Sequence, residues 1–462
     1  MSAESAYDDG KLDPASGDGA SPPPLRDLPT PGATPRGTSA AATLQAVLAA
    51  FFPKGVPIRF SFWDGSEAGP ASDESRAIVR SPEALKRLLW APGELGVARA
   101  FVAGDIDIEG DIFTVLRALH DAMSNRLPRA SDTVLPLLSA VARLRLAGLP
   151  PAPPDVEVRL PGRWRAGTLH SKQRDSDAVR THYDVSNEFY GLVLGPAMTY
   201  SCALFEHEDV TLEAAQAAKH ELVCRKLGLH ERHGARLLDV GCGWGSMALH
   251  AADRHGAEVV GVTLSPEQAK LARERVAAAG LSDRIDIRIQ DYRDLRGEQF
   301  DAISSIGMFE HVGESRMAEY FGTLHALLLP EGRMLNHAIS SVGGSKIRGR
   351  TFMNRYVFPD GELIDVADVA RGMELAGFEV RDVESLREHY ATTLRHWVAN
   401  LERHWDEAVE LVGSQRARVW RLYMAASVNG FDDGGISIHQ VLGVKPATGG
   451  RSGMPRTRAT WV

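Results

Sequence analysis

The stretch LLDVGCGWG, at residues 237–245, contains residue types that suit ligand binding. It places Asp239, Gly241, Gly243 and Gly245 at the end of an apolar run that predicts a short strand. Glycine lets the backbone approach a ligand closely, and a helix that begins after such a turn favours an anionic group at its N-terminus. Since the dinucleotide spacing G-x-G-x-x-G is not met, we expect an adenosyl cofactor without a pyrophosphate, with an ordinary glycine turn as the alternative.

A second stretch, SIGMFEHVG at residues 305–313, raises a chemical question because its apolar run opens into Glu310 and His311. Such groups are rarely fully buried without partners. Glu310 could therefore belong to a reaction centre, or it could cap the helix expected from GESRMAEYF, since carboxylates favour helix N-termini.

The elements that must position these residues alternate between strand and helix beyond residue 175, which predicts an open, largely parallel α/β sheet. The expected strands are at 236–240, 257–264, 284–290, 300–308, 332–340 and near 436–444. The expected helices are at 245–256, 265–280, 366–376 and within 392–429.

Composition shifts divide the chain into five segments. A disordered tail at 1–38 is rich in Pro, Gly and Ser, and a smaller α+β domain follows at 39–148. A proline-rich and basic linker at 149–175 leads to the main α/β domain at 176–444, and a flexible C-terminal tail is expected at 445–462.

The overall composition excludes several classes of protein. The formal net charge of −8 over 462 residues argues against nucleic acid as the main partner. No run of about 18 apolar residues and no signal-peptide pattern is present, so we expect a cytoplasmic location. The three cysteines lack paired metal-ligand spacing, so reduced thiols and no metal site are expected.

The glycine loop at 237–245 resembles the first motif of S-adenosylmethionine-dependent methyltransferases. In most such enzymes an acidic residue at the end of the second strand binds the ribose, but here Thr263, Leu264 and Gln268 stand at that place. The resemblance brings Asp291 and Tyr292 of QDYRDL to the adenine, although Asp291 could instead be a solvated loop carboxylate.

The segment HYDVSNEFYGLVLGPAMTYSCALF, at 182–205, helps to indicate which branch of these methyltransferases the chain resembles. Together with GCGWG, GVTLS, GMFEHVG, NHAIS and REHYATTL, it resembles the cyclopropane fatty acid synthases and mycolic acid cyclopropane synthases over residues 176–440. The resemblance implies a Rossmann-like class I methyltransferase sheet with helices on both faces, and it makes 39–148 a lipid-facing domain. Tyr200 and Ser201 are then expected at the cofactor as well.

This family adds a methylene carbon from S-adenosylmethionine across the cis double bond of an unsaturated acyl chain in a membrane phospholipid. The resemblance implies that a bound bicarbonate ion is the general base, held by a small polar cage. The matching positions in this chain are Cys202, Glu310, His337, Ile339 and Tyr390.

The cage residues also have structural alternatives. His337 could be a satisfied core histidine, and Cys202 could be a small buried hydrophobe rather than a nucleophile. Ser427 replaces a cysteine that some relatives carry, with no catalytic consequence. Aromatic rings could stabilise a carbocation or simply pack in the core, and the candidates are Tyr183, Phe189, Tyr190, Tyr200, Phe205 and Phe309.

Access to a lipid requires contact with a membrane surface, so we expect peripheral association with the inner face of the membrane. The candidate segments are 141–149, the basic stretch 159–174, and 343–358, with solvated linker charge as the alternative. The resemblance implies a homodimer.

Three competing functions stay open at the level of sequence. The same substrate and cofactor could give a methylene- or methyl-branched chain, the latter with a reductase partner. A small-molecule O- or N-methyltransferase lacks support, because neither an N-P-P-[YF] motif nor paired acidic metal ligands are found. A non-catalytic lipid-binding protein would leave the polar cage without a role.

Overall fold

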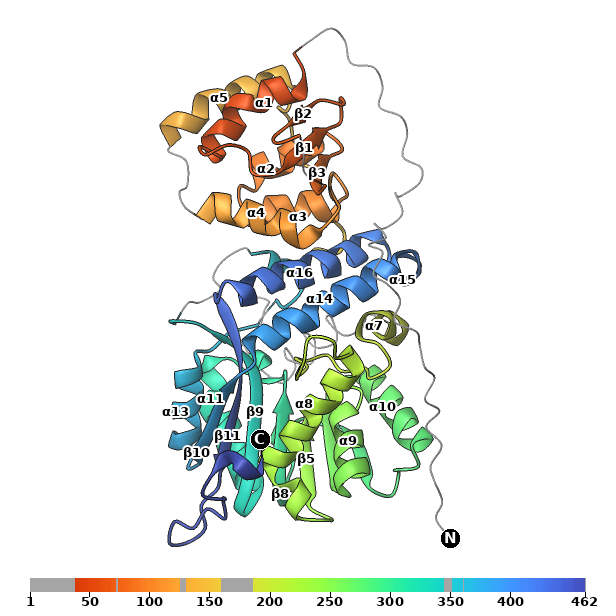
Figure 1. Cartoon of the computed structure of the whole chain (residues 1–462), viewed down its shortest axis with the longest axis vertical. Coiled ribbons are helices and arrows are strands. Elements are labelled where there is room, and N and C mark those ends of the chain that lie inside the picture. The colour runs from red at the N-terminus through yellow and green to blue at the C-terminus, as the bar shows by residue number, and fades with distance from the viewer. Residues whose placement is uncertain are drawn as a thin grey trace.

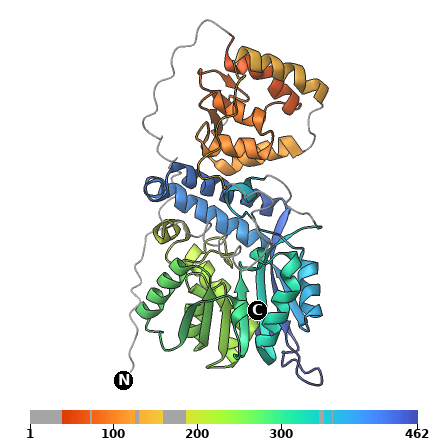
Figure 2. The same cartoon turned by 180° about the vertical axis from the view of Figure 1, so that it is seen from behind.

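The computed structural model describes residues 38–71, 74–124, 130–158, 186–344, 351–359 and 361–461. The predicted tail at 1–38, apart from its last residue, and the basic stretch 159–174 lie outside these residues. No helix in the described part of the chain is both long and apolar enough to cross a membrane. A smaller unit and a larger unit follow one another along the long axis of the molecule (Figures 1 and 2).

The smaller unit packs helices against a four-stranded sheet of order β2-β1-β3-β4. Its core includes Leu44, Phe62 and Val79, contributed by a helix and two strands. Its elements are α1 (Ala40–Phe51), β1 (Arg59–Phe62), β2 (Glu67–Ala68), β3 (Arg76–Val79), α2 (Glu83–Trp90), α3 (Glu94–Val102), β4 (Ile106–Glu109), α4 (Ile112–Ser124) and α5 (Ala130–Arg143).

The larger unit contains a seven-stranded sheet of order β10-β11-β9-β8-β5-β6-β7. The five neighbouring strands β9, β8, β5, β6 and β7 are parallel, and β11 pairs antiparallel with both β9 and β10. The fold class predicted from the sequence is confirmed, but β10 was not predicted. The strands are β5 (Arg236–Val240), β6 (Glu258–Thr263), β7 (Ile285–Ile289), β8 (Phe300–Ile306), β9 (Leu328–Ser341), β10 (Glu379–Ser385) and β11 (Ile436–Val444).

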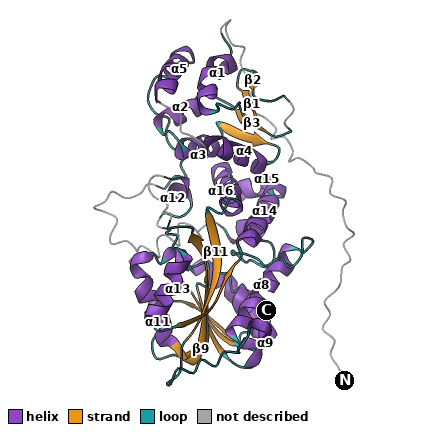
Figure 3. Ribbon diagram, turned by 60° about the vertical axis from the view of Figure 1, so that its left-hand side comes forward, coloured by secondary structure: helices purple, strands orange, loops and turns teal. Residues whose placement is uncertain are grey.

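Helices cover both faces of this sheet, and the side chains of each strand alternate between them. Leu237 packs toward α8, α9 and α10, whereas Leu238 packs toward α11 and α13. Figure 3 shows the sheet nearly edge-on between these two helical layers. The helices are α8 (Leu212–Leu227), α9 (Ser246–His255), α10 (Pro266–Ala278), α11 (Met317–Leu327) and α13 (Val366–Leu375).

A further helical layer lies between the sheet and the smaller unit (Figure 1). The helical region predicted within 392–429 begins earlier and is divided by His404 and by Gly413, whose φ is +78°. This layer buries Trp397, Trp420 and Met424 in one apolar cluster. Its helices are α7 (Asn187–Leu194), α12 (Phe352–Tyr356), α14 (Arg387–Arg403), α15 (Trp405–Val412) and α16 (Ser414–Asp432).

The segment after β11, expected to be a flexible tail, packs along the edge of the larger unit over its described residues 445–461. The Lys445 ammonium donates to the carbonyl oxygens of His325 and Leu328 at 2.9 and 2.8 Å. Trp461 is only 3% exposed. The physical reason is that the segment carries a cation that binds carbonyl oxygens at the end of α11 and the start of β9, and an indole that is buried.

Candidate active site

The glycine loop joins β5 to α9 at the carboxyl ends of the parallel strands, where open α/β sheets bind ligands. Gly241 and Gly243 have φ values of +73° and +54°, a region that other residues adopt only with strain. The amides of Gly241 and Cys242 both donate to the carbonyl oxygen of Val262, which fixes the loop against β6.

Alanine substitutions at the two glycines are expected to differ in their effect on stability. An alanine at either position would have to adopt the left-handed backbone conformation, which costs about 1–2 kcal/mol. A Cβ at Gly241 would also lie 2.8 Å from Met308 Cγ, whereas a Cβ at Gly243 meets nothing within 4 Å. Chemical denaturation should therefore show a larger loss for Gly241→Ala than for Gly243→Ala, and equal losses would contradict this packing.

A cavity opens above this loop, and all of the residues predicted to bind the cofactor line it. They come from the carboxyl ends of the strands and from the segment before α8. These residues are Tyr200, Ser201, Asp239, Gly241, Gly243, Thr263, Leu264, Gln268, Asp291 and Tyr292.

Asp239 offers this cavity an unsatisfied acceptor. Its Oδ1 accepts a hydrogen bond from Ser304 Oγ at 2.7 Å, while its buried Oδ2 has no partner among the described residues. Burial raises the pKa of the Asp239 carboxyl to about 6. A ligand that donates a hydrogen bond, such as an amine or a hydroxyl group, would satisfy this oxygen.

The other predicted polar residues already have partners within the protein. Thr263 Oγ1 donates to Gln268 Oε1 at 2.9 Å, which holds the two side chains together at the end of β6. The Asp291 carboxylate is paired with Arg293 at 2.7 Å and caps a short 3₁₀ helix. Asp291 is therefore not the solvated loop carboxylate that the sequence left as an alternative.

Lys219, on α8, lines the same cavity, and sequence reasoning missed it. Its ammonium donates to Ser201 Oγ at 2.9 Å, and the side chain is fully buried. Burial lowers the pKa of Lys219 to about 7, against the opposing influence of Cys202 and Asp239. The sequence feature that could have indicated Lys219 is its place within the small-residue run AAQAAKHEL, at 214–222, in the segment that precedes the glycine loop.

We expect Lys219→Met to flatten the dependence of stability on pH. In the folded chain Lys219 loses its proton near pH 7, whereas in the unfolded chain the same lysine keeps its proton up to about pH 10.5. The free energy of unfolding of the wild type therefore rises with pH between these two values. Thermal unfolding at pH 7 and pH 9.5 measures the effect, with exposed Lys270→Met on α10 as the control. A rise that persists unchanged in Lys219→Met would contradict the burial of the ammonium.

A second cavity adjoins the first, and Tyr200, Gly307 and His311 line both. Three of the predicted cage residues, Glu310, Ile339 and Tyr390, line this second cavity. Most of its remaining wall is apolar or aromatic and includes Phe352, Met353, Phe358, Leu363, Leu394, Tyr423, Phe431 and Ile436.

Glu310 lies in a 3₁₀ turn, Phe309–His311, directly after β8. Its Oε1 accepts a hydrogen bond from the Ile339 amide at 2.8 Å, and its buried Oε2 has no partner among the described residues. Burial raises the pKa of the Glu310 carboxyl to about 7. The amide of Ile339, one of the matching cage positions, therefore already has its acceptor in Glu310.

His337 and Cys202 lie in the packed interior and are absent from the described walls of both cavities. His337 Nδ1 lies 3.1 Å from Gln440 Nε2, so the neutral ring carries its proton on Nε2, a buried atom with no partner among the described residues. The Cys202 thiol donates to backbone carbonyls, and burial raises its pKa. Cys202 therefore fits the small buried hydrophobe of the alternative interpretation.

Of the candidate aromatic rings in the described part of the chain, Tyr200 lines both cavities and the others do not, which favours the core packing left as the alternative; Tyr183 lies outside the described residues. Phe189, Tyr190 and Phe309 pack in the core, where large apolar rings bury most surface, and Phe205 stacks on His396. His311, to which the sequence motifs gave no role at the site, lines both cavities.

Comparisons with known proteins agree with this arrangement. A family model described as mycolic acid cyclopropane synthetase matches residues 170–441, more than half of the chain. A probable fatty acid methyltransferase of Mycobacterium tuberculosis is 44% identical over 86% of this chain and 93% of its own. The cyclopropane-fatty-acyl-phospholipid synthase of Escherichia coli K12 is 34% identical over 79% and 86% of the two chains.

Among solved structures, the mycolic acid cyclopropane synthase CmaA1, complexed with S-adenosylhomocysteine and CTAB, matches with a TM-score of 0.54 and 34% identity. The match covers 58% of this chain and 97% of that one. The fold and the cavity above the glycine loop thus define an S-adenosylmethionine-dependent methyltransferase of class I. The chain belongs to the cyclopropane fatty acid synthase family, as its sequence motifs predicted.

Proposed function

We propose that this enzyme transfers a methylene carbon from S-adenosylmethionine to the cis double bond of an unsaturated acyl chain in a membrane phospholipid, giving a cyclopropane. The observation that carries the proposal is the second cavity, which is mostly apolar, contains a buried carboxyl and adjoins the cofactor cavity. An acyl chain suits its walls, and the shared residues Tyr200, Gly307 and His311 mark where the two substrates meet.

The bound cofactor supplies an electrophilic methyl group on a sulfonium centre. An alkene is a weak nucleophile, so the main contribution of the protein is to hold the double bond in line with that carbon and to exclude water. Attack of the alkene on the methyl carbon would break the carbon–sulfur bond, release S-adenosylhomocysteine and leave a carbocation on the acyl chain. Loss of a proton from the transferred carbon then closes the three-membered ring.

Aromatic rings in the second cavity support such a cation, because their faces carry negative quadrupoles. The hydroxyls of Tyr200 and Tyr423 lie 3.4 Å apart across the cavity wall. Tyr390 packs against Phe431 with ring centroids 4.8 Å apart. These four rings come from three segments far apart in the sequence and meet on the walls of one cavity.

We propose bicarbonate as the base that takes the proton. Two buried atoms without a partner among the described residues suit it: Glu310 Oε2, from a residue on the wall of the second cavity, can accept from the bicarbonate hydroxyl, and His337 Nε2, in the packed interior, can donate to a bicarbonate oxygen if the ion reaches behind that wall. His337 and Ile339 lie on the same face of β9, two positions apart. Tyr390 is the further donor that the sequence motifs assign to this anion.

Membrane contact is proposed for α5, whose outer face is apolar. Val134, Leu135 and Leu138 are 49%, 74% and 59% exposed, a concentration that marks an interaction surface. The lipid substrate class favours a bilayer as the partner. The proposed homodimer, and a reductase for a branched product, stay predictions.

The double substitution Leu135→Asp, Leu138→Asp is expected to weaken binding to phospholipid vesicles by about tenfold or more, because it removes buried apolar contact and adds charge. Vesicle co-sedimentation measures the effect. Leu375→Asp on α13 is the matched control, since Leu375 is 83% exposed on another face. Equal losses in both variants would argue against α5 as the membrane contact.

The proposed reaction is tested by mass spectrometry of acyl esters after incubation of the enzyme with S-adenosylmethionine and vesicles of unsaturated phospholipid. We expect a product one CH₂ heavier that is unchanged by mild hydrogenation, which identifies a cyclopropane. A product that takes up hydrogen would overturn the cyclopropane in favour of a methylene branch. No product would overturn the phospholipid substrate.

A further inference from the structure

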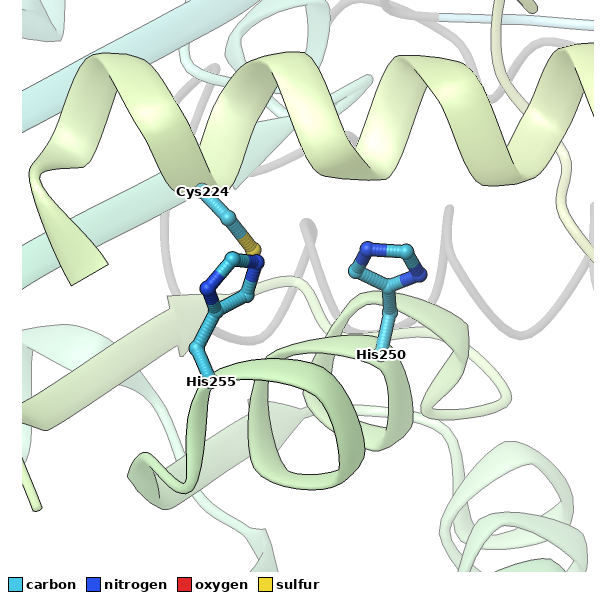
Figure 4. Close-up of side chains that lie close together, drawn as sticks. All are labelled: Cys224, His250 and His255. Carbon is cyan, nitrogen blue, oxygen red and sulfur yellow. The ribbon is translucent and has the colours of Figure 1, made fainter. Parts of the chain in front are cut away.

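Three side chains that can bind a metal ion converge where α8 packs against α9, outside both cavities. Cys224 comes from α8, and His250 and His255 come from α9; one ligand atom of each lies within 4.8 Å of the others. Figure 4 shows the Cys224 sulfur directed from its helix toward the ring of His255, with His250 beside it.

Glu221 adds an oxygen atom to this cluster. Its Oε2 lies 2.9 Å from His255 Nε2 and 3.3 Å from His250 Nε2. Glu221 and Cys224 are three residues apart on α8, a spacing that places both side chains on one face of the helix. Cys224, His250 and His255 therefore bring one sulfur and two imidazoles together between the helices, and Glu221 contacts both imidazoles.

An ordinary ion-pair network accounts for only part of this cluster. Glu221 also pairs with Arg225, and its contacts with both histidines and Arg225 lower the pKa of the Glu221 carboxyl to about 2. The network gives no role to Cys224, which is fully buried and, unlike Cys202 and Cys242, makes no hydrogen bond through sulfur within the described part of the chain. A metal ion would give the sulfur a partner.

We propose that Cys224, His250 and His255 form a structural site for a divalent transition metal ion of the zinc class, with Glu221, which contacts both imidazoles, or a water molecule as the fourth ligand. Zinc prefers four-coordinate sulfur, nitrogen and oxygen ligands at about 2.0–2.3 Å, which places ligand atoms roughly 3.3–3.8 Å apart. Small side-chain rotations within the observed cluster reach that geometry. The Cys224 thiol releases its proton to solvent as the sulfur–metal bond forms, so affinity rises with pH.

The site would connect two helices that carry the cofactor cavity. Lys219 lines that cavity two residues before Glu221 on α8, and the glycine loop leads directly into α9. A metal bond between the helices would therefore hold the floor of the cavity against its glycine loop. This inference is independent of the proposed reaction, because it concerns residues outside the second cavity.

Cobalt binding to the full-length protein tests the site, with cobalt as the spectroscopic substitute for zinc. After chelator treatment and dialysis, we expect one equivalent of Co²⁺ to give a sulfur-to-cobalt charge-transfer absorption that added Zn²⁺ abolishes. Cys224→Ser should remove this absorption, and His255→Asn should weaken Co²⁺ binding by about tenfold or more. His404→Asn is the matched control, since His404 also lies beside a carboxylate, 3.5 Å from Glu407.

Several results would overturn the proposed metal site. Absence of the absorption in wild-type protein overturns the site, and so does an absorption that survives Cys224→Ser. If Cys224→Ser does not fold, the wild-type protein still decides the matter: thermal unfolding should shift upward with equimolar Zn²⁺, and the shift should be smaller in His255→Asn. An unchanged melting temperature would reject the site.

Discussion

Glu310→Gln should lower turnover by about 10²-fold or more while S-adenosylmethionine affinity stays close to that of the wild type. The carboxyl lines the second cavity and is not among the residues that line the cofactor cavity, and its Oε2 is buried without a partner among the described residues. The amide of glutamine keeps one acceptor for the Ile339 amide but cannot carry negative charge. Calorimetric titration and product mass spectrometry measure the two quantities separately.

The matched control is Glu314→Gln, which makes the same change at an exposed position four residues further along the chain. Full turnover in Glu310→Gln would refute the proposed polar cage. A parallel loss of cofactor affinity would place Glu310 in the cofactor site instead. Equal losses in the two variants would point to a structural effect of the 3₁₀ turn.

The pH dependence of this variant gives an independent readout. Burial raises the pKa of Glu310 to about 7 from an ordinary value of 4.5, so the folded state holds a proton that the unfolded chain has released across this window. The contribution of Glu310 to stability is therefore present below pH 4.5 and is lost as the pH rises through 7. Glu310→Gln should consequently melt at a higher temperature than the wild type at pH 8, although it is less active.

The sequence predicted the parallel strands and the glycine loop well, because short apolar runs and glycine spacing are local signals. It missed β10, since this edge strand carries several charged residues; Asp382 on it is buried against Lys226 at 3.0 Å. The pairing between Glu310 and the Ile339 amide also escaped prediction, because it joins residues 29 positions apart.

The aromatic rings of the second cavity and the proposed metal site show a second limit of prediction from the sequence, because their residues come from separate segments of the chain. Ring-rich sequence near the cofactor motif suggested a lining, yet most of those rings pack in the core, and the rings that do line the second cavity include Tyr423 and Phe431 from α16. Likewise, Cys224 and His250 belong to separate helices with a strand and a loop between them. No spacing rule for ligands on one segment detects such a cluster.

Arg418→Met is expected to produce the largest loss of stability, because Arg418 joins the smaller unit to α16. Its guanidinium donates to the carbonyl oxygens of Phe101 and Ile106 at 2.6 and 2.7 Å and pairs with Asp107 at 3.2 Å. Both charged partners are buried, and contact with Arg418 helps to lower the pKa of Asp107 against the opposing influence of burial. Removal of one partner from a buried ion pair costs about 3–5 kcal/mol.

Loss of this contact should separate the unfolding of the two units into distinct calorimetric transitions, and it should lower activity on vesicle lipid with cofactor affinity retained. Arg421→Met is the matched control, since Arg421 is equally buried on the same helix but pairs with Glu402 inside the larger unit. A second substitution, Asp107→Asn, should recover part of the stability lost in Arg418→Met, because it removes a buried charge that then keeps only Arg80, at 3.0 Å, as an ionic partner among the described residues. A single transition in Arg418→Met, at the wild-type temperature, would show that other contacts hold the smaller unit in place.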